Sequence, residues 1–300
     1  MKRLSFLIGL ALVLVSIPGS DVSAATEDSA FAELVDSIID ESGHEVAVAF
    51  FDSETGETFL RNDRVRMHAA STMKVPVMLA IFDAVSRGEL DLDQDIEVEN
   101  EFVSIIDGSP YSLSFEEDGD PGLYEAVGST RSLRELTTRM ITHSSNLATN
   151  IVIELVGATR VMALMESIGA HDIQVLRGVE DIKAYRAGKS NTTTAHDLMI
   201  VFGALLGHDG MSGEASEEMI GILAAQHFNE SIPAGLPDGT RVAHKTGQIT
   251  EIHHDAGIIF PPDRKPYVLV VLTRGFEQSE DAYRVTAKIS RAIWESVVGE

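Results

Sequence analysis

The two ends of this 300-residue chain share a hydrophobic pattern that its middle lacks. Short apolar runs bounded by turn residues, which are typical of β-strands, lie at 45–51, 57–60, 241–246, 256–260 and 267–273. An amphipathic helical pattern precedes this group within 25–43, and a longer one follows it at 279–298. The pattern therefore predicts one sheet assembled from both ends of the chain, with a helix at each end.

The middle of the chain shows helical periodicity, interrupted by capping residues and glycines. We expect one helix to begin near Ser71 and end at Gly88, and Ser132 with Glu135 forms a capping box before a second helix. Further helices are predicted at 146–157, 159–168, 195–206 and 215–226. Residues 89–130 are acidic and rich in turn formers, which predicts an ordered but irregular insertion.

These elements predict an α/β fold joined to an all-α part. The simplest arrangement is an antiparallel sheet flanked by the N- and C-terminal helices, with a helical domain inserted between its two halves. We assign 25–66 and 236–300 to a discontinuous sheet domain, and 67–235 to a mainly helical domain. A cleft between two such domains is a common place for an active site.

The N-terminus has the pattern of a secretory signal peptide. Lys2 and Arg3 give it a positive start, an apolar run covers 4–17, and the small residues of 22–24 offer a cleavage site. An uncleaved membrane anchor is the alternative, but the run is shorter than the roughly 20 residues that a bilayer span needs. We therefore expect residues 1–24 to be removed and the protein to be periplasmic or secreted, with no stable membrane insertion afterwards.

Composition and charge narrow the classes of partner. Hydrophobic residues make up 44% of the chain, which is enough for a sizeable core. The formal net charge of −24 is spread along the chain, so its field repels nucleic acid and anionic membranes. No cysteine is present, which excludes disulfides and thiol catalysis. We expect a monomer that binds a small molecule and needs no cofactor.

The most informative motif is Ser71-Thr72-Met73-Lys74. Near the start of a helix, side chains three residues apart share one face, so the Lys74 amine can reach the Ser71 hydroxyl. A serine hydroxyl is a poor nucleophile at neutral pH, whereas a lysine in a partly dry pocket can lose its proton and act as a base. The motif therefore indicates covalent catalysis by an activated serine.

Two further motifs follow in order, Ser-Ser-Asn at 144–146 and Lys-Thr-Gly at 245–247. Each is common by itself, but with Ser71 and Lys74 they supply a second hydroxyl with an amide, and a second amine on a strand. The ordered set resembles that of class A β-lactamases and penicillin-binding proteins. The resemblance covers about 27–300 and implies a β-lactamase/transpeptidase-like fold and an exported serine hydrolase.

Acyl transfer assigns a role to each polar group of these motifs. Ser71 would attack the carbonyl carbon, and Lys74 would accept or relay its proton. Ser144 would pass a proton to the departing amide nitrogen. Asn146 would hold Lys74 and the substrate amide by hydrogen bonds. Lys245 would make the local potential more positive and attract a substrate carboxylate.

Residues beside the Lys-Thr-Gly motif would complete the substrate site. Thr246 can donate a hydrogen bond to the substrate carboxylate, and Gly247 leaves room beside the strand. The resemblance implies an oxyanion hole made by the backbone N–H groups of Ser71 and Gln248. Arg274, at the end of the last predicted strand, is a second candidate for binding the carboxylate, or else a surface arginine.

A carboxylate on a loop decides between two activities. Class A β-lactamases activate the deacylating water with a glutamate that follows an arginine and precedes an asparagine by four positions. Glu180 is the candidate here, but it lies three positions after Arg177 rather than two, and Ala184 stands where the asparagine is expected. Asp181 is a weaker candidate, and Glu180 could instead be a loop carboxylate paired with a neighbouring cation.

Several functions stay open on the sequence. The leading hypothesis is a serine hydrolase that opens β-lactam amides through an acyl-serine. A D-Ala-D-Ala carboxypeptidase or penicillin-binding protein with slow deacylation comes next, followed by a non-catalytic binder of penicillin or cell-wall peptide. A metal-dependent hydrolase comes last, because His253 and Asp255 share a strand face but lack an evident third ligand. We therefore expect no metal site.

Overall fold

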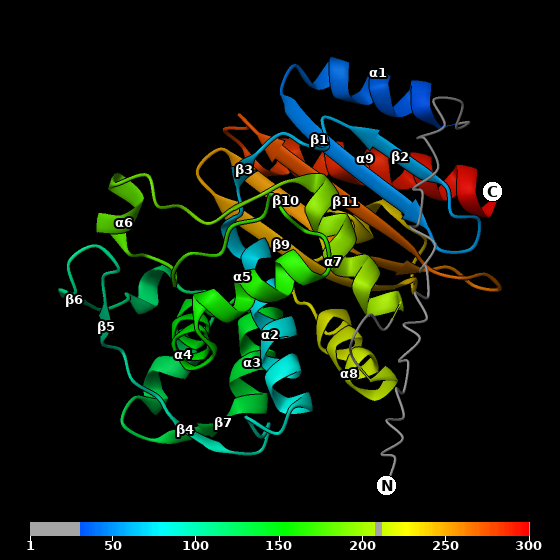
Figure 1. The fold of residues 1–300 in the computed structure, drawn as a ribbon. Helices are drawn as coiled ribbons and strands as arrows, with labels where there is room; N and C mark the ends of the chain where they lie inside the picture. The colour runs from blue at the N-terminus through cyan, green and yellow to red at the C-terminus, as the bar shows by residue number, and fades with distance from the viewer. Residues whose placement is uncertain (1–30, 208–211, 300) are drawn as a thin grey trace, which may run out of the picture.

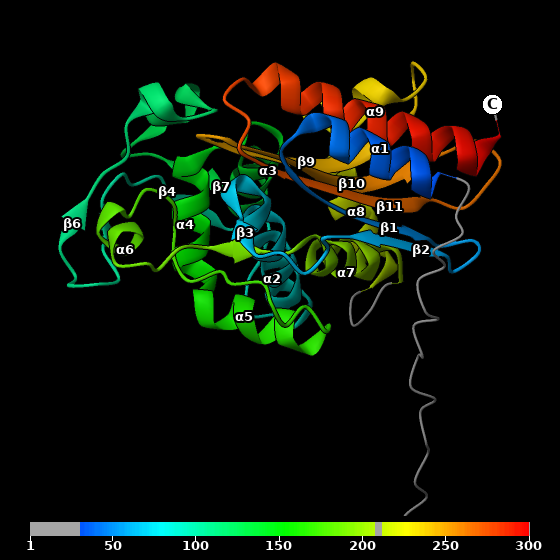
Figure 2. The ribbon, with the colours of Figure 1, turned by 90° about the horizontal axis from the view of Figure 1, so that it is seen from above.

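The computed structural model describes residues 31–207 and 212–299 (Figure 1). The predicted signal peptide, residues 1–24, lies outside the described residues. The described part is built on one five-stranded sheet with helices against both of its faces (Figure 2). The predicted fold class, an antiparallel sheet flanked by terminal helices with helices inserted, is confirmed.

Both ends of the chain contribute strands to the sheet. Its members are β1 (Glu45–Asp52), β2 (Thr58–Arg61), β9 (Arg241–Ile249), β10 (Ile252–Phe260) and β11 (Tyr267–Arg274). The order is β2-β1-β11-β10-β9, and every neighbouring pair is antiparallel. Val48 lies opposite Val271, so the N-terminal hairpin is joined to the C-terminal strands at the centre of the sheet. Strand β9, which carries the Lys-Thr-Gly motif, is therefore an edge strand.

Alternation along β1 divides the core into two layers. Val46, Val48 and Phe50 face α1 (Ala32–Ser42) and α9 (Ser279–Val298), whereas Ala47 and Ala49 face the inserted helices. Figure 2 shows α1 and α9 together on one face of the sheet. Small alanines on the opposite face let the inserted helices approach the sheet closely.

The inserted helices surround one that is buried almost completely. They are α2 (Lys74–Ser86), α3 (Leu133–Thr142), α4 (Asn146–Val156), α5 (Ala158–Ser167), α7 (Ala195–Gly207) and α8 (Gly213–Ala224). Helix α2 is apolar on all sides and packs against α3, α4, α5 and α8. The capping box is half formed, because Ser132 Oγ accepts the Glu135 N–H at 3.1 Å while the Glu135 carboxylate pairs with Arg131 and Arg139.

The start of α2 differs from the sequence prediction. The segment Ala70–Met73 is a 3₁₀ turn, and the α-helix begins at Lys74. Further 3₁₀ helices lie at Phe115–Glu117, Pro121–Ala126 and Pro233–Gly235. Because a 3₁₀ turn has three residues per turn, Ser71 and Lys74 are nearly eclipsed there.

The predicted irregular insertion contains short two-stranded ribbons. Strands β4 (Asp95–Glu97) and β7 (Thr130–Ser132) pair, as do β5 (Phe102–Val103) and β6 (Pro110–Tyr111). A third ribbon joins β3 (Met67–His68), just before the nucleophile turn, to β8 (Thr192–Thr193). The short helix α6 (Ile182–Arg186), which hydrophobic periodicity did not indicate, lies beside β5 and β6 (Figure 1).

Within the described ranges, no single helix has both the length and the apolar composition needed to cross a bilayer. Helices α4 and α5 meet the test only as a pair, and they are bent by 79° relative to each other.

Truncation of the α9 contact with the sheet should destabilise the protein. Ile293 is fully buried in the layer beneath α9, so Ile293→Ala should lower the free energy of unfolding by about 2–5 kcal/mol. Lys288→Ala, on the exposed side of the same helix, should change it by no more than about 0.5 kcal/mol. Urea unfolding of the three proteins measures both values, and equal stabilities would contradict the assigned packing.

Candidate active site

One cavity of about 340 Å³ is lined by a residue of each of the first two motifs and by the residue that follows the third. Ser71, Asn146, Glu180 and Gln248 all line it. They come from the 3₁₀ turn before α2, the start of α4, the loop before α6, and strand β9. Segments far apart in the sequence therefore meet at one hollow whose size suits a small molecule.

The turn that carries Ser71 has a strained backbone. Ala70 has a φ of 46°, a region that residues other than glycine rarely adopt. Its N–H donates to Nδ1 of His68 at 3.0 Å, so the imidazole carries its proton on Nε2. Burial, and secondarily the Arg177 guanidinium, lowers the pKa of His68 and favours this neutral form. His68 thus holds the residue that precedes the candidate nucleophile.

The Lys74 amine is fully buried and points at the Ser-Ser-Asn motif. Its Nζ donates to Ser144 O at 2.7 Å, to Ser144 Oγ at 3.2 Å and to Asn146 Oδ1 at 2.9 Å. Among the described residues, no hydrogen bond joins Nζ to Ser71 Oγ. The contact expected from helical spacing is absent from this resting arrangement, because the three deeper acceptors hold Nζ.

The environment of Lys74 favours the neutral amine. Burial lowers the pKa of Lys74 to about 7, while the Asp118 and Glu180 carboxylates act in the opposite direction. At this value a substantial fraction of the amine is unprotonated near neutral pH. A neutral amine donates two protons and keeps one lone pair, so in that form the Ser144 hydroxyl donates to Nζ across their 3.2 Å contact. The lone pair lets the amine accept a proton within the site.

The turn before α4 is fixed by Asp118, which reaches across from the insertion. Its carboxylate accepts the backbone N–H groups of the first two residues of α4, at 3.0 and 2.8 Å. A carboxylate at a helix N-terminus satisfies free donors and the helix dipole. Ser144 is held there with a φ of 57°. A Cβ on Gly119 would lie 2.1 Å from His143 O, so glycine is required for this close approach.

Glu180 is joined to Lys74 through one amide. Asn146 Nδ2 donates to Glu180 Oε1 at 2.8 Å, and Asn146 Oδ1 accepts from Lys74. Burial raises the pKa of Glu180, and the neighbouring carboxylates Glu117 and Asp118 raise it further, whereas the Asn146 hydrogen bond and Lys74 lower it. A carboxyl with a raised pKa is a better proton acceptor when ionised.

Strand β9 places a second buried amine beside the first. Burial, with the nearby positive charge of Lys74, holds the pKa of Lys245 well below its usual range, against the effect of Asp255. Lys245 Nζ donates to Thr246 O at 2.9 Å. A Cβ on Gly247 would lie 3.1–3.2 Å from atoms of the nucleophile turn. Gly247 therefore lets β9 pack closely against that turn.

Of the predicted substrate-binding residues Gln248 and Arg274, only Gln248 lines the active-site cavity. Gln248 lines the cavity, and its side chain accepts a hydrogen bond from Tyr283 OH at 2.8 Å. Arg274 lies at the end of β11, where its Nε donates to Glu45 at 2.6 Å, and it does not line the cavity. Binding of a substrate carboxylate by Arg274 stays a prediction.

The residues considered for a metal have other partners. Asp255 accepts from Ile232 N at 3.0 Å and lies 2.8 Å from His244 Nδ1. His253 and His254 contact backbone carbonyl oxygens through Nε2, at 3.3 and 3.0 Å. In residues 31–207 and 212–299, no group of three or more His, Asp or Glu side chains is arranged to hold a metal ion.

Three residues that support the site were missed in the sequence. Asp118 caps α4, His68 holds Ala70, and Asn150 accepts the Val179 N–H at 2.6 Å beside Glu180. The Asp-Gly-Asp sequence around Asp118 looked like an ordinary turn. Its position 28 residues before Asn146 carries no local signal of contact with a helix N-terminus.

A comparison with family models agrees with this geometry. The model described as the β-lactamase enzyme family matches residues 30–297, which is most of the chain. The chain belongs to this family. It is a β-lactamase-like serine hydrolase, and the resemblance inferred from the three motifs is confirmed.

Individual members of the β-lactamase enzyme family are distant in sequence. A β-lactamase of Streptomyces fradiae is 26% identical, over 82% of this chain and 79% of its own. The crystal structure of a β-lactamase from Sphaerobacter thermophilus DSM 20745 has a TM-score of 0.74 at 25% identity, covering 92% of this chain and 99% of the other. A PBP-A mutant, solved as an acyl-enzyme with penicillin G, has a TM-score of 0.76 at 22% identity, covering 90% and 97%.

Proposed function

We propose that this protein hydrolyses β-lactam amides through an ester on Ser71. One observation carries the proposal: a hydrogen-bonded chain from Ser144 through Lys74 and Asn146 to Glu180 borders the cavity that Ser71 lines. This chain contains a proton acceptor for each half of an acyl-transfer reaction. Export to the periplasm or the medium, as the N-terminal pattern predicts, would place the enzyme where β-lactams act on the cell wall.

Acylation would use the buried amine. Ser71 Oγ attacks the lactam carbonyl carbon, and its proton passes to neutral Lys74 as the C–O bond forms. The backbone N–H groups of Ser71 and Gln248 would bind the oxyanion. Ser144 donates its proton to the lactam nitrogen as the C–N bond breaks, and is reprotonated by Lys74, its hydrogen-bond partner. The ring is then open, and its acyl carbon is esterified to Ser71.

Deacylation would use the loop carboxylate. Glu180 accepts a proton from a water molecule, and the hydroxide attacks the ester carbonyl. The C–O bond to Ser71 breaks, and the serine oxygen recovers the proton from Glu180. The raised pKa of Glu180, which follows from its burial, suits this acceptor role.

The second amine would select for an anionic substrate. Burial lowers the pKa of both amines, and the positive charge of Lys74 lowers the pKa of Lys245 further by repulsion. A carboxylate bound beside Lys245 and Thr246 would relieve this repulsion and stabilise the Lys245 ammonium. β-lactams and cell-wall peptides both carry such a carboxylate.

A penicillin-binding peptidase is the second candidate function. It is favoured by Ala184, which is buried and presents only a methyl group four positions after Glu180. With no amide there, Glu180 has Asn146 as its one hydrogen-bonding side-chain partner among the described residues. A poorly placed water would leave the acyl group on Ser71 and give a slow hydrolase, a D-Ala-D-Ala peptidase or a penicillin trap.

We also propose that the protein acts as a monomer.

Incubation with a chromogenic cephalosporin, followed by intact mass measurement, tests the proposed function. We expect multiple turnovers per molecule and a transient adduct of the opened lactam. Ser71→Ala is the matched control and should abolish the adduct and reduce turnover at least about a thousandfold. A stable adduct without turnover would favour the peptidase or the trap, and the absence of both would exclude the serine mechanism.

Glu180→Gln should separate the two half-reactions. The amide keeps the shape of the side chain but cannot accept the proton of water, so deacylation should slow by about a hundredfold or more. Acylation should continue, and the acyl-enzyme should accumulate in the mass spectrum. Stopped-flow kinetics gives both rates, and an unchanged release rate would show that Glu180 is not the base.

The rate of acylation should fall as the pH drops through about 7, because Lys74 then becomes protonated. Asp118 raises the pKa of Lys74, so Asp118→Asn should lower that pKa. The acid limb of the pH profile, which is this fall in the acylation rate, should then move to lower pH. Glu116→Gln removes an exposed carboxylate two residues away and should leave the limb in place. The pH profile of adduct formation measures the shift, and a shift to higher pH would contradict the assigned electrostatics.

A further inference from the structure

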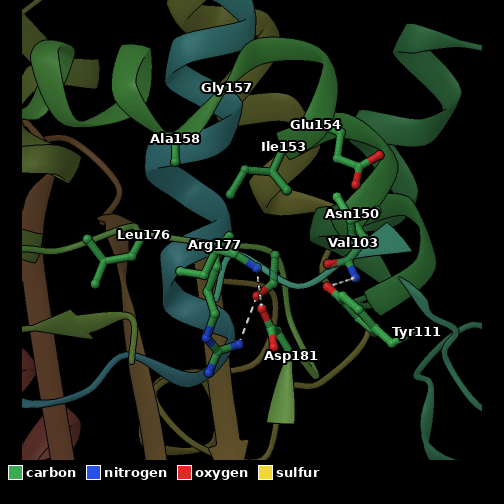
Figure 3. A pocket seen from close by; sticks show the side chains of 12 residues that line it. Val103, Tyr111, Asn150, Ile153, Glu154, Gly157, Ala158, Leu176, Arg177 and Asp181 are labelled. Carbon is green, nitrogen blue, oxygen red and sulfur yellow. Dashed lines mark hydrogen bonds between the residues drawn. The ribbon is translucent and has the colours of Figure 1, made fainter. Parts of the chain in front are cut away.

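The hairpin formed by β5 and β6 lies against the loop that carries Glu180. We call residues 102–111 the loop clip and residues 177–186 the carboxylate loop. Figure 3 shows Val103 and Tyr111 of the clip near Asp181 and Arg177 of the carboxylate loop. The clip belongs to the insertion, and its hydrogen bonds reach residues on both sides of Glu180.

Asp181, the residue after Glu180, accepts hydrogen bonds from the loop clip. Its Oδ1 accepts from Ser104 Oγ at 2.9 Å and from Ala184 N at 3.0 Å, and its Oδ2 accepts from Ile105 N at 2.9 Å. Both Asp181 and Ser104 are buried. The sequence left Asp181 as a weaker candidate base. In the structure both carboxylate oxygens of Asp181 accept hydrogen bonds that join the clip to the carboxylate loop, so its role is structural.

Val179 is held on the other side of Glu180. Asn150 Oδ1 accepts the Val179 N–H at 2.6 Å, and Asn150 Nδ2 donates to Val179 O at 3.1 Å. Tyr111 OH, from the clip, also donates to Val179 O at 3.3 Å. Between these two anchors Glu180 has a φ of 60°, a strained conformation that persists only where the surroundings impose it.

Packing alone does not fix the carboxylate loop. A cavity of about 250 Å³ lies between the loop, the clip and the end of α4, and it is the one drawn in Figure 3. A second cavity of about 470 Å³ lies between the clip and α6, and Glu180 borders it as well as the active-site cavity. Because there is open space on two sides, the polar contacts must hold Glu180 toward Asn146.

We propose that Ser104 and Asp181 are positioning residues, through which the loop clip holds the Glu180 carboxylate in place for deacylation. The proposal rests on the proposed function, since it assigns Glu180 to the release step. Without the clip, the strained backbone at Glu180 can relax and its carboxylate can turn toward the second cavity. A displacement of about 1 Å from the productive position can cost a hundredfold in rate.

Lys183 offers a matched control on the same two segments. Its Nζ donates to Asp107 at 2.8 Å and to Ser109 at 2.6 Å, so it also joins the loop to the clip. The Lys183 and Asp107 side chains are about half exposed, and such surface ion pairs contribute little to the stability of a fold. Lys183→Ala should therefore change either half-reaction by less than about fivefold.

The test compares acylation and deacylation in Ser104→Ala and Asp181→Asn. Stopped-flow mass spectrometry with the chromogenic cephalosporin should show deacylation slowed by about ten- to a hundredfold, and acylation within about fivefold of the unmodified protein. In Glu180→Gln, addition of Ser104→Ala should slow release no further, because the base that the clip positions is already gone. Circular dichroism confirms that each variant is folded.

The role of the loop clip, but not the proposed hydrolysis, would be overturned by unchanged release in a folded Ser104→Ala variant or by an equal loss in both half-reactions. Further slowing of release in the Ser104→Ala, Glu180→Gln double variant would also overturn it, because the clip would then act by another route. An unmodified protein that acylates without turnover would overturn the proposed hydrolysis, and the clip with it.

Discussion

A buried amine is the constraint on which the rest of the site depends. Lys74 has no exposed surface, and an ammonium in such a place needs either compensating charge or the loss of its proton. Lys74 has both: nearby carboxylates compensate part of its charge, and its lowered pKa lets it lose the proton near neutral pH. Ser144 and Asn146 accept its hydrogen bonds, Asp118 and Glu180 lie near enough to oppose the effect of burial, and its pKa settles near 7. A full countercharge in direct contact would hold the proton permanently, and no countercharge would leave the amine too weak a base.

Backbone strain occurs at three points around this amine. Ala70, Ser144 and Glu180 are three residues with positive φ that are not glycine, and each belongs to a different segment of the site. A separate restraint holds each one: His68 for Ala70, the Asp118–Gly119 loop for the Ser144 turn, and Asn150 together with the loop clip for Glu180. Strain of this kind persists only where surrounding contacts impose it. The insertion, which provides Asp118 and the clip, is thus part of the support of the site.

Local sequence signals predicted the sheet and most helices, because those follow from hydrophobic periodicity and capping. The same is true of the three motifs, whose chemistry is legible residue by residue. The residues that hold the site in place, such as Asp118 and Ser104, were not predictable from local signals. Asp118 caps a helix that starts 28 residues later, and Ser104 binds a carboxylate 77 residues away. Such contacts depend on how the chain returns on itself, and an Asp or Ser in a turn-rich segment has the same local appearance with or without them. Local spacing also does not reveal that Ser144 and Asn146, just before and at the start of α4, accept the hydrogen bonds of the Lys74 amine in place of Ser71.

The proposed mechanism places its two half-reactions on different parts of the chain. Ser71, Lys74 and Ser144 lie on or beside helices packed into the core, so their geometry is fixed by the same contacts that stabilise the fold. Glu180 lies on a loop flanked by cavities and held by polar contacts to an insertion. Under the proposed mechanism, a change in the insertion would alter release without altering attack, whereas a change in the core would alter both. Within one fold, the difference between a hydrolase and a penicillin trap can then arise from residues that never touch the substrate.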